Sequence, residues 1–148
     1  TVMTPKYLPT YLKLAEEFKV APFMPRPTRE QLIGVGLGDQ IEVYEKMFES
    51  LEMRGVPLLD HMIIDTLKPR KDKVKFYCKL IEKLEPGVTH FLFHPAKMSP
   101  ELMVITPDSA KLRNQDYEAF TNPRLKECLE RNNIIIIGYR EIQKIIKK

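Results

Sequence analysis

The stretch "VTHFLFHPAK", residues 88–97, places two histidines around three large apolar residues, and Pro95 directly follows the second histidine. The phenylalanines in this stretch favour a β-strand, and Pro95 cannot continue a central strand because it has no backbone N–H to donate. On a strand, His90 and His94 lie about 13 Å apart at ~3.3 Å per residue. A metal ion bonds its ligands at about 2 Å, so the spacing predicts that the two histidines do not share one ion.

Position along this strand separates the two histidines. In parallel α/β folds, functional groups collect where strands end and loops begin. His94 is the last residue of the predicted strand and is the candidate functional residue, with a satisfied core histidine as the alternative. His90, at the beginning, is expected to be structural or exposed. Asp60 and His61 lie in another predicted strand, either as site residues or as a hydrogen-bonded structural pair.

Apolar segments with the character of strands recur along the whole chain. They cover residues 19–25, 56–65, 88–94 and 134–139, and segments with helical periodicity separate them. Strands that alternate with helices, and that are apolar almost throughout, are typical of a parallel sheet covered on both faces. We therefore predict an α/β fold with a parallel sheet of about four strands in a single unit over residues 1–148.

A long polar segment, residues 95–115, follows His94 and is expected to be a loop. Loops of this length in a compact domain are commonly functional. This region and the residue directly after it supply Asp108, Arg113 and Asp116 as further candidates. The glycines at 34, 36 and 38 follow no predicted strand and lack the full phosphate-binding fingerprint, so they are interpreted as an ordinary loop.

Composition limits the possible partners. The net charge is +4 and the pI is about 9.0, but the densest basic run, residues 68–79, carries an apolar pattern suited to one face of a helix. We interpret the run as a solvated helix face and expect no nucleic-acid partner. The longest apolar run, "IIIIG", is far shorter than the ~20 residues of a membrane span, so no membrane partner is expected. Two cysteines without a CxxC spacing indicate reduced packing residues in a cytoplasmic protein.

Several motifs occur in an order that resembles a known family. "PGVTHFLFHPAK" is followed by "TPDSAKLRNQDYEAF" and then by "IIIIGYREI", while "PKYLPTYLKLAEEFKVAPFMPRP" and "GVPLLDHMI" precede them. In this order and spacing they resemble the C-terminal portion of the YdjC-like carbohydrate deacetylases, also called the ChbG/HpnK family. The resemblance covers essentially all 148 residues.

The resemblance implies a (β/α) barrel-like fold and a hydrolase that removes N-acetyl groups from sugars or related conjugates. A divalent metal, magnesium or zinc, polarises the amide carbonyl and activates water in that mechanism, and an acid protonates the leaving amine. His94 matches the histidine of the family's "HP" motif, an active-site residue. Arg113 matches a late arginine that orients substrate or a carboxylate, and Asp60 and His61 match a "DH" pair expected to contact substrate.

The chain departs from the family pattern in its metal ligands. The family's acidic "DD" motif and histidine cluster belong to its N-terminal half, and no histidine precedes His61 here. We therefore expect no metal ligands in this chain, only part of the pocket, and no deacetylase activity from the chain alone. The alternative is a non-catalytic α/β binding or self-association module, because an open half-barrel leaves apolar edges that favour a homo-oligomer or a partner half.

Overall fold

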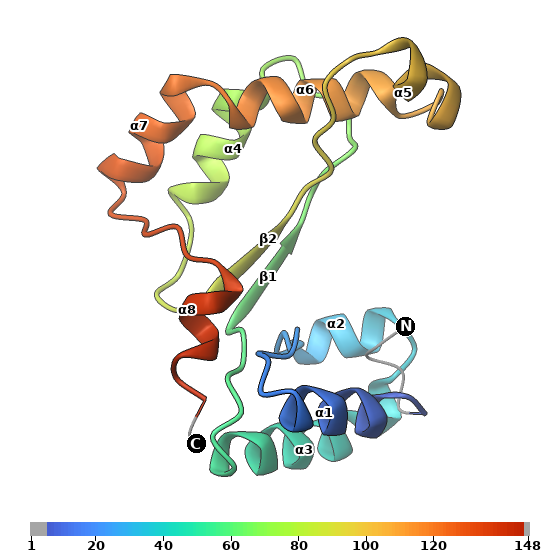
Figure 1. Ribbon diagram of the computed structural model, residues 1–148, viewed down its shortest axis with the longest axis vertical. Coiled ribbons are helices and arrows are strands. Elements are labelled where there is room, and N and C mark those ends of the chain that lie inside the picture. Colours follow the sequence, from blue (N-terminus) through green and yellow to red (C-terminus); the bar gives the residue numbers. More distant parts are fainter. Residues whose placement is uncertain (1–5, 147–148) are drawn as a thin grey trace. The chain divides into compact units, whose positions relative to one another are not determined.

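The computed structural model describes residues 6–146, and these residues form two compact units (Figure 1). The first unit contains the described parts of Thr1–Met62, Gly87–His90 and Ile137–Lys148, and the second contains Ile63–Pro86 and Phe91–Ile136. None of the described helices combines the length and the apolar character needed to cross a membrane.

The first unit is mainly helical. Its helices are α1 (Leu8–Glu17), α2 (Arg29–Gly34), a 3₁₀-helix η1 (Gly38–Gln40), α3 (Ile41–Met53) and α8 (Tyr139–Gln143). Helices α1, α2 and α3, with Met24 from the segment between α1 and α2, bury a core of Leu8, Met24, Leu32, Tyr44, Phe48 and Leu51. Helix α2 begins with a capping box, in which the Thr28 hydroxyl accepts from the backbone of Gln31 and the Gln31 side chain accepts in return.

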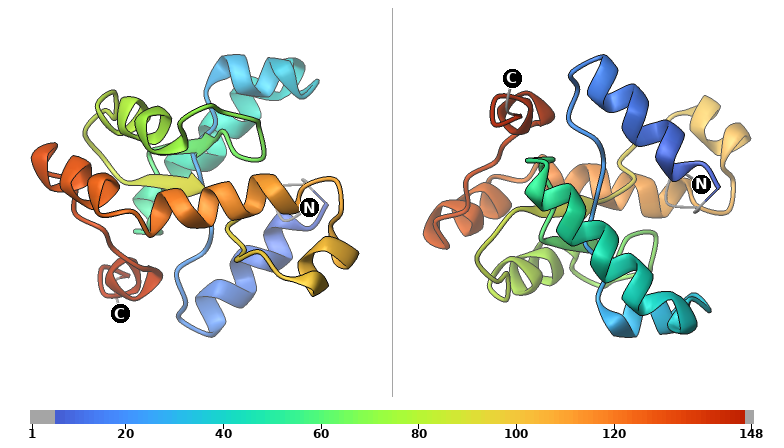
Figure 2. Two further views of the ribbon diagram at one scale, coloured as in Figure 1. Left: turned by 90° about the horizontal axis from the view of Figure 1, so that it is seen from above. Right: turned by 90° about the horizontal axis from the view of Figure 1, so that it is seen from below.

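The second unit packs three helices around aromatic side chains. They are α4 (Lys73–Ile81), α6 (Ala110–Phe120) and α7 (Pro123–Arg131), and a short helix α5 (Pro100–Ile105) precedes α6. The chain changes direction between α6 and α7 (Figure 1), and two further views show α7 beyond one end of α6 (Figure 2). The buried core consists of Tyr77, Ile81, Ala119, Leu125 and Cys128. The rings of Phe91 and Phe93 pack on Phe120, the second of them stacked at 3.9 Å between centroids.

The sheet is parallel and contains two strands among the described residues, β1 (His61–Ile64) and β2 (Thr89–Leu92). The α/β class is confirmed, but the four-strand sheet is not. The proline-rich segment 19–25 makes a single parallel bridge, from Pro25 to Leu59, because each proline removes a backbone donor from the ladder.

The last predicted strand, residues 134–139, is not a strand in the structure. Ile135 is 84% exposed and Ile136 78% exposed. The backbone of residues 135–137 has no hydrogen bond to any residue that the structure describes. A run of β-branched residues has the propensity for a strand, but a strand also requires a partner edge. The segment from Tyr139 onward begins α8 instead.

Candidate functional site

A cluster of polar side chains lies in the second unit, beside the segments that follow the two strands. We call Thr66, Lys73, Tyr77 and Asp116 the Asp116 cluster. Thr66 follows β1, Lys73 and Tyr77 lie on α4, and Asp116 lies on α6. Asp116 is completely buried and Lys73 is 6% exposed. Charged groups are buried in proteins only when they are paired and hydrogen-bonded, and this cluster meets that condition.

Every donor in the Asp116 cluster is directed at the carboxylate. Lys73 Nζ and Tyr77 Oη each donate to Oδ1 at 2.6 Å, and the Thr66 hydroxyl donates to Oδ2 at 2.5 Å. Burial by itself raises the pKa of Asp116, but the hydrogen bonds from Lys73, Thr66 and Tyr77 outweigh it and lower the pKa below the usual value. Burial and the hydrogen bond to Asp116 raise the pKa of Tyr77, so its hydroxyl stays a donor.

His94 begins a loop that is attached to α6 by alternate backbone N–H groups. His94 N donates to Asp116 Oδ2 at 3.4 Å, Ala96 N to Arg113 O at 3.1 Å, and Met98 N to Asn114 Oδ1 at 2.7 Å. Strand β2 ends at Leu92, so His94 lies two residues beyond the strand rather than at its last position. The loop is shorter than predicted, because α5 and α6 occupy much of residues 95–115.

The His94 side chain has one nitrogen that needs a partner. Nδ1 is buried and has no hydrogen-bond partner among the described residues, although the imidazole as a whole is partly exposed. Buried polar atoms are normally satisfied, and each exception calls for an explanation. An imidazole nitrogen can donate or accept a hydrogen bond. Because the residue is partly exposed although Nδ1 is buried, His94 is a candidate for ligand contact at the start of this loop.

Arg113 lies on α6 in the same unit as His94. Its Nε donates to Ser109 Oγ at 3.1 Å, and its backbone carbonyl accepts from Ala96. The structure therefore brings the loop that contains His94 against the helix turn that carries Arg113. A guanidinium has five N–H donors in a planar fork, and the bond to Ser109 uses one of them.

Asp60 and His61 belong to the first unit, at the start of β1. Asp60 Oδ2 accepts from the backbone N–H of Val88 at 2.7 Å. Gly87 approaches the same carboxylate so closely that a Cβ atom on it would lie 2.8 Å from Oδ2. Asp60 therefore has a structural role between the segments that lead into the two strands. A substrate contact by Asp60 or His61 stays a prediction.

His90 packs as a structural residue, as its position in the strand predicted. Its ring lies edge-on to Phe23 at 4.8 Å between centroids, and Tyr139 contacts it at 6.3 Å. Burial lowers the pKa of His90, which favours the neutral ring.

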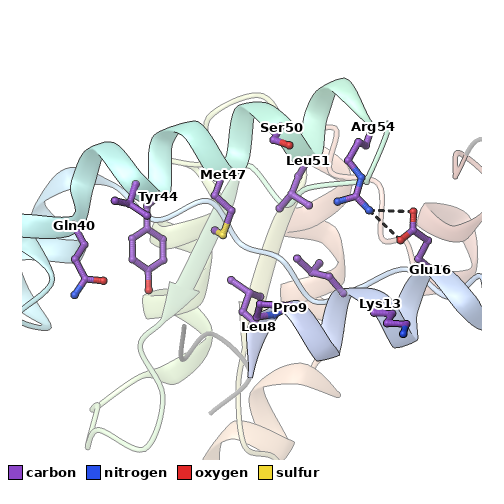
Figure 3. Close-up of a pocket in the computed structure, with 12 residues that line it drawn as sticks. Leu8, Pro9, Lys13, Glu16, Gln40, Tyr44, Met47, Ser50, Leu51 and Arg54 are labelled. Carbon is purple, nitrogen blue, oxygen red and sulfur yellow. Dashed lines mark hydrogen bonds and ion pairs between the residues drawn. The ribbon is translucent and has the colours of Figure 1, made fainter. Parts of the chain in front are cut away.

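A separate groove lies between α1 and α3 in the first unit (Figure 3). Its volume is about 470 Å³, and most of its lining is apolar, with Leu8 and Pro9 facing Met47 and Leu51. The ion pair between Arg54 and Glu16, at 3.0 Å, joins the two helices at one end. None of the candidate residues His94, Arg113, Asp60 and His61 lines this groove.

The side chains that the structure describes do not form a site for a resident metal ion. Among residues 6–146, no group of three or more histidine, cysteine, aspartate or glutamate side chains is placed to hold one. The carboxylate of Asp116 has Lys73 as a neighbour, and a cation would have to compete with that ammonium group for Oδ1.

The sequence did not identify Thr66, Lys73 and Tyr77 as a polar cluster. Lys73 lies in the basic run that was interpreted as a solvated helix face, and this part of the interpretation is wrong because Lys73 is buried against Asp116. One pattern in the sequence indicates that Lys73 is buried. Lys73 and Tyr77 are four residues apart, so they lie on the same face of a helix, and in α4 this face is buried.

In many enzymes with parallel α/β folds, the active site lies in the loops that follow the strands. The loop that contains His94 has this position after β2. The chain belongs to the YdjC-like protein family, whose model matches residues 1–131 of the 148. No curated protein matches the chain.

Proposed function

We propose that this chain forms part of the pocket of a metal-dependent carbohydrate deacetylase, a hydrolase that removes an N-acetyl group from a sugar or related conjugate. The family match over residues 1–131 carries the proposal, because YdjC-like membership suggests a function related to carbohydrate deacetylation. The position of His94 supports it, because the residue is partly exposed and begins the loop that follows β2.

Within this chain, His94 and Arg113 are the two residues with proposed roles in the deacetylation reaction. His94 contacts the reacting acetamido group and holds or transfers a proton there. Arg113 orients the substrate with the donors that Ser109 does not occupy. The divalent metal of the family would need ligands other than those described here, so no step of the reaction is assigned to it in this chain. The cytoplasmic location stays a prediction.

An acetate-release assay tests the partial-pocket part of the proposal. The purified chain is incubated with N-acetylglucosamine and with zinc or magnesium, and acetate is measured enzymatically. We expect no acetate above the rate without protein. Metal-dependent acetate release that is lost in His94→Ala would show a complete active site and contradict this part. Sequencing the DNA upstream of Thr1 is the complementary test, because an in-frame "DD" motif and histidine cluster would supply the metal ligands.

A second candidate function is a non-catalytic binding or self-association module. The exposure of Ile135 and Ile136, at 84% and 78%, favours it, because adjacent exposed isoleucines are typical of surfaces that bind a partner. Sedimentation velocity over a range of concentrations separates the two candidates. A sedimentation coefficient that rises with concentration, and stops rising in Ile135→Lys, would support the module. A constant monomer value would count against it.

A further inference from the structure

The two carboxylate oxygens of Asp116 contact different parts of the second unit. Oδ1 accepts from Lys73 Nζ and Tyr77 Oη, both on α4. Oδ2 accepts from the Thr66 hydroxyl, just after β1, and lies 3.4 Å from the backbone N of His94, just after β2. One carboxylate therefore links the segments that leave both strands and joins them to α4.

We propose that Asp116 is a positioning residue for His94, acting through Oδ2 and Thr66, while Lys73 and Tyr77 hold the carboxylate in place through Oδ1. The inference rests on the proposed function only in treating His94 as the residue that contacts substrate. Asp116 itself is completely buried, so it acts through the loop and not on the substrate.

The hydrogen bonds to both oxygens hold the Asp116 carboxylate in one orientation. A carboxylate has two oxygens with about four acceptor positions, and both oxygens of Asp116 hold donors at 2.5–2.6 Å. Rotation about the Cβ–Cγ bond would break these charge-assisted bonds inside a buried site, where an unpaired polar group is costly. The ammonium group of Lys73 balances the negative charge, so the cluster is stable without a further ion.

The separation of the two oxygens makes the proposal testable by single hydroxyl deletions. Thr66→Val removes the donor that shares Oδ2 with His94, and Tyr77→Phe removes a donor to Oδ1 only. Thr66→Ser keeps the hydroxyl and is the conservative rescue. Thr121→Val is the matched control, because that hydroxyl, also in the second unit, donates to the carbonyl of Tyr117.

The first readout is the backbone amide of His94 in ¹H–¹⁵N spectra of the full chain, with its hydrogen-exchange rate. We expect Thr66→Val to shift this amide and to accelerate its exchange, because Oδ2 loses the hydroxyl group that fixes its position. The acceleration should be about tenfold or less, since the variant removes the bond from Thr66 and only loosens the bond from His94. Thr66→Ser and Thr121→Val should leave the amide near its original position. Tyr77→Phe should shift it less than Thr66→Val does, because Lys73 still holds Oδ1. The Cys128 amide in α7 reports global destabilisation, so the His94 change must exceed the change at Cys128.

An unchanged His94 amide in Thr66→Val, or equal changes in Thr66→Val and Tyr77→Phe, would overturn the positioning role. The second readout is the dissociation constant for N-acetylglucosamine, which should increase in Thr66→Val and recover in Thr66→Ser. Equal binding by the original chain and Thr66→Val would also overturn the role. Absence of sugar binding in the original chain would instead refute the proposed function, and the amide readout would still decide whether Asp116 positions the loop.

Discussion

The ammonium nitrogen of Lys73 lies 2.6 Å from Oδ1 of Asp116, and both side chains are buried. The pair joins α4 to α6, and Tyr77 completes it from one turn further along α4. Because a buried charge without its partner is far more costly than a surface charge, this contact is expected to dominate the response of the second unit to substitution.

Asp116→Asn should reduce the free energy of unfolding by about 3–5 kcal/mol, because it leaves the Lys73 ammonium buried without a counter-charge. Urea denaturation followed by circular dichroism measures the loss. The double variant Asp116→Asn with Lys73→Met should be less destabilised than Asp116→Asn alone, since it removes both charges. Asp108→Asn, at an exposed position, is the control and should change stability by less than about 0.5 kcal/mol. Equal losses at positions 108 and 116 would contradict this account.

The lowered pKa of Asp116 predicts a specific dependence of stability on acid. The folded state holds the ionised carboxylate, so its contribution is fully present above the pKa of an unfolded aspartate, about 4. It is lost as the pH falls from there through the lower folded-state pKa. Urea midpoints between pH 6 and pH 2 should fall steeply in the original chain and less steeply in Asp116→Asn. Parallel curves would show that Asp116 does not have this role.

Gly87 is expected to be essential for the connection into β2. Its φ is +133°, and an added Cβ would lie 2.8 Å from Asp60 Oδ2 and 3.0 Å from Asp60 Cβ. Gly87→Ala should therefore cost about 1–3 kcal/mol from the backbone conformation, with the contact to Asp60 in addition. Gly34→Ala is the matched control, because no atom lies within 4 Å of its added Cβ, and it should be neutral or slightly stabilising. Thermal denaturation of both variants checks this, and similar melting temperatures would refute it.

Cys78 should react slowly with alkylating reagents. Burial and a hydrogen bond with the Cys128 thiol raise the pKa of the Cys78 thiol to about 11. At pH 8 the thiolate fraction is then more than about a hundredfold below that of a free cysteine, whose pKa is about 8.5. Iodoacetamide labelling followed by mass spectrometry measures the rate, and unfolding in urea should restore it. Because the unfolded thiol ionises first, its contribution to stability should be lost as the pH rises from about 8.5 towards 11. Rapid labelling of the folded chain would be the contrary result.

The spacing of apolar residues along the sequence predicted those helices whose buried faces are apolar. The stripe of Tyr44, Phe48 and Leu51 is buried in α3, and the strands at β1 and β2 lie where apolar runs predicted them. Residues 110–115, the first half of α6, were interpreted as loop because the segment is polar, and the buried face of this helix includes Asp116. A buried carboxylate resembles a surface residue in sequence, and only the donors from α4 and Thr66 show otherwise.

The sheet and the site were predicted less completely, for a related reason. Strand propensity is local, but pairing depends on an available edge, so residues 134–139 did not form the predicted strand. His94 and Arg113 were candidates from the sequence, and the structure places them in the second unit, on a loop and a helix that share a backbone hydrogen bond. Their roles stay predictions. Thr66, Lys73 and Tyr77 come from two other segments, and no spacing in the chain indicates that they meet at Asp116.

The most direct test of the central claim is saturation-transfer NMR of the full chain with N-acetylglucosamine, using glucosamine as the control ligand without the acetyl group. We expect transfer to the acetyl methyl group, little transfer to glucosamine, and loss of the signal in His94→Ala. The control Glu127→Gln, at an exposed position on α7, should retain the signal. Equal transfer to both sugars, or transfer that persists unchanged in His94→Ala, would contradict the claim that His94 belongs to a site for N-acetylated carbohydrate.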